Sequence, residues 1–259
     1  SITQINMDND SLTGTLDISS LTNLTYFSVQ TNPMLNYIIN PNSSQSIITY
    51  NVLNSGLTGT LDISGLTEFG GIFNVNSNSK LNYILNPSSN ALVTQYITYS
   101  CGLMGTLDLK PLKNMSYIIW IQSNPSLNTV LFPNSSQNIS SLYIDNCKLT
   151  GTLDISGLTG LSSDFRANGN TNLNYILNPS TNGMFSYYSI NDCGLMGTLD
   201  LRPIKKLGGN VYLHTNPSLN TILFPDSSVA ISSLQLYSSG LSGTLDISSL
   251  TGLSGSFVA

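Results

Sequence analysis

Charge is scarce in this sequence. Charged residues make up 8% of the 259 residues, and Lys and Arg together number eight, whereas about 25% of the residues in typical soluble domains are charged. Because a basic stripe is needed to neutralise a phosphate backbone, we expect no nucleic-acid partner. The surface must instead be covered by Asn, Ser, Thr and Gly.

Long apolar runs are also missing. No stretch approaches the roughly 18 apolar residues that a membrane span requires, and the first residues lack the charged and apolar regions of a signal peptide. We therefore expect no membrane insertion, and we interpret the chain as a fragment of a longer protein.

Residues suited to catalysis are few. The one histidine is His214, and the sequence has no G-x-S-x-G elbow, no H-E-x-x-H motif and no Gly-rich phosphate loop. A Ser-His-Asp grouping around His214 can be imagined because serine is common, but an exposed surface histidine is the simpler interpretation. We expect no enzyme activity, no cofactor and no metal site.

What the chain has in abundance is repetition. The tetrapeptide Gly-Thr-Leu-Asp begins at Gly14 and recurs in steps of 45, 46, 46, 46 and 46 residues, at Gly59, Gly105, Gly151, Gly197 and Gly243. Each step holds two half-repeats of about 23 residues. The first type, from Leu142, runs L-Y-I-D-N-C-K-L-T-G-T-L-D-I-S-G-L-T-G-L, and the second, from Ile119, runs I-W-I-Q-S-N-P-S-L-N-T-V-L-F-P-N-S-S.

Both half-repeats resemble the repeat of leucine-rich-repeat proteins, L-x-L-x-x-(N/C)-x-L, over essentially the whole chain. This resemblance implies a β-rich solenoid of about eleven coils, with a parallel sheet on the concave side and short strands, 3₁₀ turns and loops on the convex side. Residues 1–259 would form a single solenoid without its terminal caps. The coil L-T-G-T-L-D-I-S-G-L-T-G-L further resembles repeats of bacterial surface proteins and of phage structural or fibre proteins.

The sixth position of each half-repeat holds a small or polar residue that can be buried with a hydrogen bond. These residues include Asn32, Asn78, Asn124, Asn170 and Asn216 in the second type and Cys101, Cys147 and Cys193 in the first. We expect them to form an internal ladder that bonds the backbone of the loops. The cysteines would lie two coils, or about 9 to 10 Å, apart, beyond the roughly 7 Å limit for a disulfide. We therefore expect inert, buried thiols.

A slower rhythm of 92 residues overlies the repeat, because the segments L-N-T-V-L-F-P and L-N-T-I-L-F-P alternate with L-N-Y-I-L-N-P. We interpret this as duplication of a four-coil block. The aspartates of the tetrapeptide also form a column, at Asp17, Asp62, Asp108, Asp154, Asp200 and Asp246. At roughly 10 Å intervals they are too far apart to share a calcium ion, so we expect them to cap the adjacent turn.

The candidate binding residues lie on the concave face. In each strand the first and third residues should point inward, which leaves the second and fourth pointing outward. The outward candidates are Tyr99, Trp120, Gln122, Tyr143, Asp145, Arg166, Tyr212, His214 and Tyr237. Aromatic rings among amides and carboxylates suit carbohydrate or protein recognition. The alternative is that a sheet with few charges shows such groups without any binding role.

The resemblance to surface and phage proteins implies an adhesin or receptor-binding module, located outside the cell, on a cell surface or on a virion. Its partner would be a surface glycan or protein. The alternative is a structural repeat, such as a spacer, coat or filament subunit, that assembles with itself through its coil ends.

Two further alternatives are weaker. A parallel β-helix polysaccharide lyase would need clustered acids and bases, and ice binding would need a regularity that the outward positions lack. N-glycosylation sequons, which matter only in a secreted eukaryotic protein, begin at Asn9, Asn23, Asn42, Asn114, Asn134 and Asn138.

Overall fold

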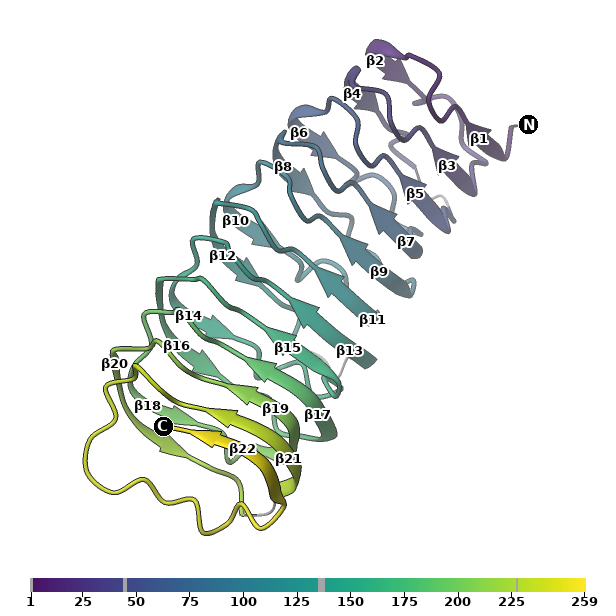
Figure 1. The fold of residues 1–259 in the computed structure, drawn as a ribbon. Helices are drawn as coiled ribbons and strands as arrows, with labels where there is room; N and C mark the ends of the chain where they lie inside the picture. The colour runs from purple at the N-terminus through teal and green to yellow at the C-terminus, as the bar shows by residue number, and fades with distance from the viewer. Residues whose placement is uncertain (1, 44–45, 135–137, 227) are drawn as a thin grey trace. The chain divides into compact units, whose positions relative to one another are not determined.

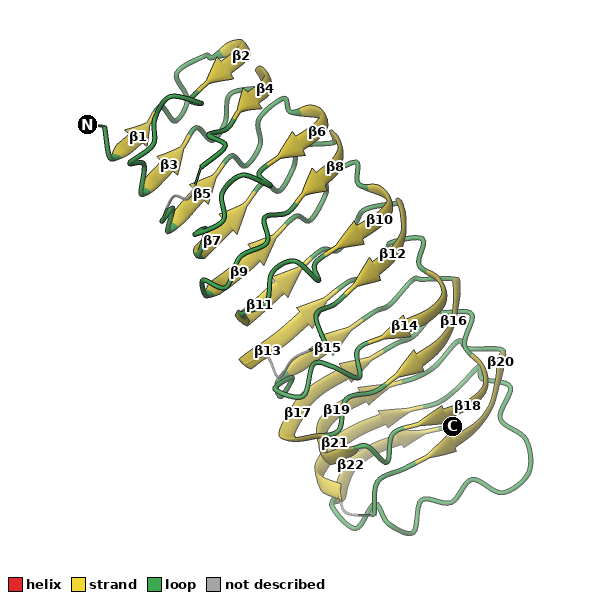
Figure 2. Ribbon diagram, turned by 180° about the vertical axis from the view of Figure 1, so that it is seen from behind, coloured by secondary structure: helices red, strands yellow, loops and turns green. Residues whose placement is uncertain are grey.

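The computed structural model of this chain describes residues 2–43, 46–134, 138–226 and 228–259. It is a parallel β-solenoid of about eleven turns, as the repeat predicted, and the described residues contain no helix (Figures 1 and 2). The chain forms two compact units, residues 1–133 and 134–259. Three residues of the Asn134 sequon region, 135–137, lie outside the described residues, as does residue 44 of the Asn42 sequon.

The first unit consists of strands that come from successive coils and pair in parallel. One sheet orders its strands as β1 (Gln4–Asn6), β3 (Tyr26–Ser28), β5 (Thr49–Asn51), β7 (Gly71–Asn74), β9 (Val93–Ile97) and β11 (Met115–Trp120). We call this the long sheet. The return side holds three two-stranded sheets, β2 (Thr13–Asp17) with β4 (Met34–Ile39), β6 (Thr58–Asp62) with β8 (Lys80–Leu85), and β10 (Met104–Asp108) with β12 (Ser126–Leu131).

The second unit repeats this arrangement. Its long sheet contains β13 (Asn138–Tyr143), β15 (Asp164–Arg166), β17 (Thr181–Ser189), β19 (Ile204–Tyr212), β21 (Ser228–Gln235) and β22 (Leu253–Val258). Its return side pairs β14 (Thr150–Asp154) with β16 (Asn172–Leu177) and β18 (Met196–Asp200) with β20 (Ser218–Leu223). Figure 1 labels these strands.

Strand pleating explains which residues fill the core. Phe165 and Ala167 are fully buried, whereas Arg166 between them points away from the core. The same alternation buries Leu142 and Ile144 on either side of Tyr143. Since successive side chains of a strand point to opposite faces, each coil contributes one set of apolar residues to the interior and one set of mixed residues to the surface.

No 3₁₀ helix is assigned among the described residues. The returns use isolated turns instead, in which Leu66 N donates to Ile63 O at 3.0 Å and Phe69 N donates to Leu66 O at 2.9 Å. A 3₁₀ helix requires consecutive i→i+3 bonds. Here the bonds fall three residues apart, so each turn stays separate.

Buried asparagines bind the backbone of neighbouring coils. Asn170 Nδ2 donates to the carbonyl oxygens of Ile144 at 3.0 Å and Ala167 at 2.9 Å. Its Oδ1 accepts a hydrogen bond from Leu149 N at 3.3 Å. One amide thereby satisfies three backbone groups that the turns of the coil leave without a strand partner.

In the coils that alternate with those of the buried asparagines, a cysteine or serine occupies the equivalent position. Cys193 Sγ donates to Ala167 O at 3.1 Å, Cys101 Sγ donates to Val75 O at 3.2 Å, and Ser55 Oγ donates to Val29 O at 3.0 Å. Cys101, Cys147 and Cys193 are all buried and free. Burial raises the pKa of the Cys101 and Cys193 thiols to about 12, so both are held in the unreactive protonated form.

Candidate functional site

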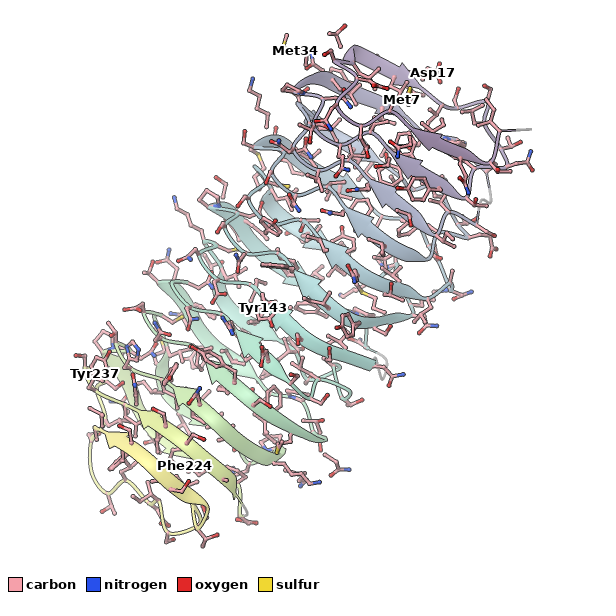
Figure 3. All side chains as sticks on the ribbon, turned by 45° about the vertical axis from the view of Figure 1, so that its right-hand side comes forward. Met7, Asp17, Met34, Tyr143, Phe224 and Tyr237 are labelled. Atoms are coloured by element: carbon pink, nitrogen blue, oxygen red, sulfur yellow. The ribbon has the colours of Figure 1, made fainter. Side chains whose placement is uncertain are left out.

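The outward face of the second unit's long sheet carries a continuous series of aromatic and charged side chains. The strand register aligns Tyr143 with Arg166, Arg166 with Ser189, and Ser189 with Tyr212. We define the aromatic row as Tyr143, Arg166, Tyr187, Tyr212, His214 and Tyr237. Figure 3 shows Tyr143 and Tyr237 as sticks on the ribbon.

Arg166 is held between two tyrosine rings. Its guanidinium carbon lies 4.2 Å from the ring centroid of Tyr187 and 5.2 Å from that of Tyr143. Asp164 accepts a 2.8 Å hydrogen bond from the Tyr143 hydroxyl and forms a 3.8 Å ion pair with Arg166. Cation–π contacts of this kind contribute about 0.5–2 kcal/mol. The arrangement fixes three long side chains that would otherwise sample several rotamers.

The row continues through ring contacts. Tyr187 and Tyr212 meet edge to face with ring centroids 5.3 Å apart. His214 stacks on Tyr237 with centroids 4.4 Å apart and an interplanar angle of 7°. The Tyr212 and His214 rings lie 6.5 Å apart. Because each ring is braced by the next, the surface is largely ordered before any ligand arrives.

Beside the rings lies a hydrogen-bonded polar network from three successive coils. Asp145 Oδ1 accepts from Asn168 N at 2.8 Å and from Asn168 Nδ2 at 2.7 Å. Asn168 Oδ1 in turn accepts from Asn191 N at 3.0 Å and from Ser189 Oγ at 2.6 Å. The carboxyl of Asp145 is mostly removed from water, and this burial raises its pKa.

The first unit carries a smaller aromatic pair on the outward face of its own long sheet. Trp120 aligns with Ile97 in the strand register, and the Trp120 ring lies 4.6 Å from that of Tyr99. Gln122 follows Trp120 by two residues, is half-buried, and points to the same side. The structure thus distributes the nine predicted binding residues over two surfaces, one in each unit.

Tyr187 is a member of the aromatic row that the sequence analysis missed. It aligns with Asp164 and Asn210 in the neighbouring strands. The sequence pattern counted strand positions from the buried Tyr188 onward, so Tyr187 fell one residue before the first position. The pleat was the available signal: because Tyr188 points inward, Tyr187 must point outward. Strand β17 is nine residues long, so the outward face extends further than the repeat motif suggests.

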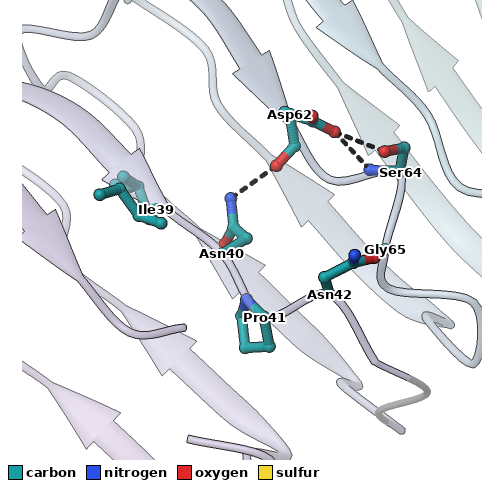
Figure 4. A pocket seen from close by; sticks show the side chains of 8 residues that line it. Ile39, Asn40, Pro41, Asn42, Asp62, Ser64 and Gly65 are labelled. Atoms are coloured by element: carbon teal, nitrogen blue, oxygen red, sulfur yellow. Dashed lines mark hydrogen bonds between the residues drawn. The ribbon is translucent and has the colours of Figure 1, made fainter. Parts of the chain in front are cut away.

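The aspartates of the repeated tetrapeptide accept hydrogen bonds from the backbone of the adjacent turn. Asp62 Oδ1 accepts from Ser64 N at 2.9 Å and from Ser64 Oγ at 2.6 Å (Figure 4). The corresponding bond from the backbone nitrogen two residues on occurs at Asp17, Asp108, Asp154, Asp200 and Asp246. Among the described residues, no three His, Cys, Asp or Glu side chains come together as a metal site would require.

A hollow of about 370 Å³ lies on the return side of the first unit, between residues 38–42 and 62–65 (Figure 4). Asn40 Nδ2 donates to Asp62 O at 2.9 Å, and Asp62 is bonded to Ser64. Three of the polar residues that line the hollow, Asn40, Asp62 and Ser64, are therefore engaged in bonds within the fold. The hollow is therefore a poorer candidate for a binding site than the aromatic row.

No helix in the described part of the chain is long and apolar enough to cross a bilayer. Comparison with known proteins found no match to a protein-family profile, a curated protein or a solved structure. We therefore infer the function from the site itself.

Proposed function

We propose that the chain is a non-catalytic recognition module of a cell surface, the extracellular space or a virion, and that it binds a surface glycan or protein through the outward faces of its long sheets. The observation that carries this proposal is the aromatic row, a pre-ordered set of rings beside a network of amides and carboxylates. Such a surface offers contact area and hydrogen bonds without a catalytic group at its centre.

The energetics of binding support this proposal. Tyrosine and tryptophan provide large contact areas at a low cost in side-chain entropy, because each has only two rotatable side-chain bonds. Ordering a long side chain at an interface costs about 0.5–1.5 kcal/mol. Arg166 is already fixed by Tyr143 and Tyr187, so little of that cost remains to oppose binding.

We further propose that the coils belong to the leucine-rich-repeat class. In support, the buried residues of adjacent strands pair at intervals of 23, as Phe165 does with Tyr188 and Tyr50 does with Phe73. The buried asparagine of the motif also bonds the turn backbone, as described for Asn170. An experimental structure that showed a different coil length or a differently placed asparagine would contradict this assignment.

Adhesion measurements test the recognition proposal. Fluorescently labelled protein would be applied to a panel of bacterial and algal cells, as wild type and as the variants Tyr212→Ala, Tyr237→Ala and Trp120→Ala. Loss of a central aromatic residue in a binding surface typically costs 2 kcal/mol or more, which corresponds to about thirtyfold weaker binding. We expect a loss of this size in at least one of the row variants.

Tyr175→Ala is the matched control, because Tyr175 is 45% exposed in the same unit but lies in β16 on the return side. It should bind as wild type does. If the cells bind the chain and all three outward-face variants adhere as strongly as the control, the outward faces are not the recognition surface.

A further inference from the structure

We infer that the ligand of the aromatic row is an uncharged glycan chain that lies across successive coils of the second unit. This inference rests on the proposed function and specifies its ligand. It follows from three properties of the row: which side chains it lacks, how its charges are engaged, and how its rings are spaced.

Aliphatic side chains are absent from the second and fourth outward positions of the coils that carry the row, from β13 to β21. The second strand positions are Tyr143, Arg166, Ser189, Tyr212 and Gln235, and the fourth positions are Asp145, Asn168, Asn191, His214 and Tyr237. The exposed aliphatic residues of this sheet lie outside these positions, at Met184 in the first half of β17 and at Val258 in the last strand, β22. Protein interfaces are also enriched in Tyr and Arg, but their buried centre is more apolar than the rest of the surface, and no aliphatic side chain accompanies the rings at these positions. A sugar instead presents a C–H face that packs on aromatic rings and a rim of hydroxyls that bond amides.

The charged groups of the surface are engaged with one another. Arg166 is covered by two tyrosine rings and pairs with Asp164, which also accepts the Tyr143 hydroxyl. Asp145 is bonded by Asn168, and Asp192 is bonded by Asn191.

The balance of these charges disfavours ionic ligands. Three carboxylates against one guanidinium would repel a sulfated or carboxylated polymer, as would the net charge of −5 on the chain. A cationic polymer would have to compete for carboxylates that already have partners. Of these groups, Asp192 is exposed and the Arg166 side chain is 38% exposed. Because Arg166 and two of the three carboxylates already have partners, hydrogen-bonding dipoles and rings are the main groups that the row offers to a ligand.

The direction of the row sets the orientation of the ligand. The row crosses the strands, and neighbouring strands lie about 4.8 Å apart. One sugar of a linear glycan is comparable in length to this step. A chain laid across the coils would therefore pass Tyr143 of β13, Arg166 of β15 and Tyr187 of β17, and then reach Tyr212 and Tyr237 on the next two coils. Because one sugar can reach only one or two rings, affinity should increase with chain length.

The test uses the full 259-residue chain and immobilised polysaccharides of matched size. The uncharged polymers are laminarin, xyloglucan and galactomannan; alginate and carrageenan are anionic, and chitosan is cationic. Binding would be measured by biolayer interferometry at low and high NaCl concentration for wild type, Tyr212→Ala, Tyr237→Ala and the control Tyr175→Ala. Thermal unfolding checks that each variant is folded.

We expect at least one uncharged polymer to bind with an affinity that changes less than about twofold with salt, since no ion pair forms. Tyr212→Ala and Tyr237→Ala should weaken this binding at least about tenfold, and Tyr175→Ala should leave it unchanged. Oligosaccharides of the same polymer should bind more tightly as they lengthen.

Three results would overturn the inference: binding only to alginate, carrageenan or chitosan, binding to none of the six polymers, or binding that Tyr212→Ala and Tyr237→Ala leave intact. The adhesion assay separates this failure from failure of the proposed function. If cell binding still depends on Tyr212 or Tyr237, the proposed function stands and the ligand is a charged glycan or a protein. If cell binding does not depend on the outward faces, both the proposed function and the inference are wrong.

Discussion

Tyr188 donates a 2.7 Å hydrogen bond to Asn178, a residue of the preceding coil, inside the second unit. The Tyr188 side chain is fully buried, and Asn178 Nδ2 donates to Asp200 O at 2.9 Å, so one asparagine links the tyrosine to the next return strand. Two coils on, Phe224 takes the place of the asparagine and Leu234 that of the tyrosine. A hydrogen-bonded pair and an apolar pair thus occupy equivalent positions.

The first prediction is that the residues at positions 178 and 188 are energetically coupled in their contribution to stability. Tyr188→Phe should destabilise the fold by about 1–3 kcal/mol, because it leaves the acceptor of the buried Asn178 without its partner. Combining Asn178→Phe with Tyr188→Leu, which copies the Phe224 and Leu234 pair, should cost less than the two single changes added together. Urea unfolding of wild type, Asn178→Phe, Tyr188→Leu and the double variant measures the coupling, and strictly additive losses would count against it.

The second prediction concerns the buried ladder. Asn170→Ala should cost about 2–5 kcal/mol, because two buried carbonyl oxygens and one buried N–H lose their partner. Cys193→Ser should change stability by less than about 1 kcal/mol, because Ser55 already makes the equivalent bond with its hydroxyl. Thermal and urea unfolding would measure both variants, and equal losses would mean that the side-chain bonds do not stabilise the coil.

The third prediction is a loss of stability at alkaline pH. Burial raises the pKa of Cys101 and Cys193 to about 12, whereas an unfolded thiol titrates near 8.5. A group whose folded pKa is raised stabilises the fold below the unfolded pKa, and this contribution is lost as pH rises toward the folded value. Each thiol should therefore lower stability by up to about 1.4 kcal/mol per pH unit above roughly 8.5.

The double variant with Cys101→Ser and Cys193→Ser is the control for this effect. Its free energy of unfolding should vary less between pH 8.5 and 9.5 than that of wild type, in a range below the titration of tyrosine. A thiol reagent should label the native protein at these two positions only as fast as the protein opens. Equal pH dependence in both proteins would show that the thiols do not titrate with unfolding.

The fourth prediction compares two glycines that both have positive φ. Gly209 (φ 59°) lies in β19, and a Cβ added there would meet Ser186 O at 1.9 Å; Gly151 (φ 66°) has nothing within 4 Å of that position. Gly151→Ala should cost about 1–2 kcal/mol of backbone strain. Gly209→Ala should cost about 3 kcal/mol or more, because the neighbouring strand must also move. Similar unfolding midpoints for the two variants would contradict this ranking.

Much of the fold was predictable because it is determined by short sequence patterns that recur in every coil. Alternation along each strand identifies Leu142 and Ile144 as core residues, and the repeat carries that assignment to every coil. The returns were harder to predict, since whether an apolar segment such as that around Leu66 forms a helical turn depends on bonds that the sequence pattern does not determine.

The site was predictable only in part. The pleat places Arg166 and Tyr212 on the outward face, but the contact of Arg166 with Tyr187 depends on how two long side chains bend across adjacent strands. The bond between Asn178 and Tyr188 also lay beyond the motif, because it joins the return of one coil to the strand of the next. The sequence signal for this bond was that both residues change together: Asn178 and Tyr188 are replaced by Phe224 and Leu234 two coils later.

NMR of the chain with ¹³C-labelled tyrosine rings, titrated with laminarin, xyloglucan and galactomannan, tests most directly that the aromatic row is the contact surface for an uncharged glycan. The account predicts that one of these polymers shifts the ring signals of Tyr187, Tyr212 and Tyr237 and leaves those of Tyr37, Tyr83 and Tyr175, the exposed tyrosines of the return strands, unchanged. Shifts confined to the return-strand tyrosines, or no shift with any of the three polymers, would contradict it.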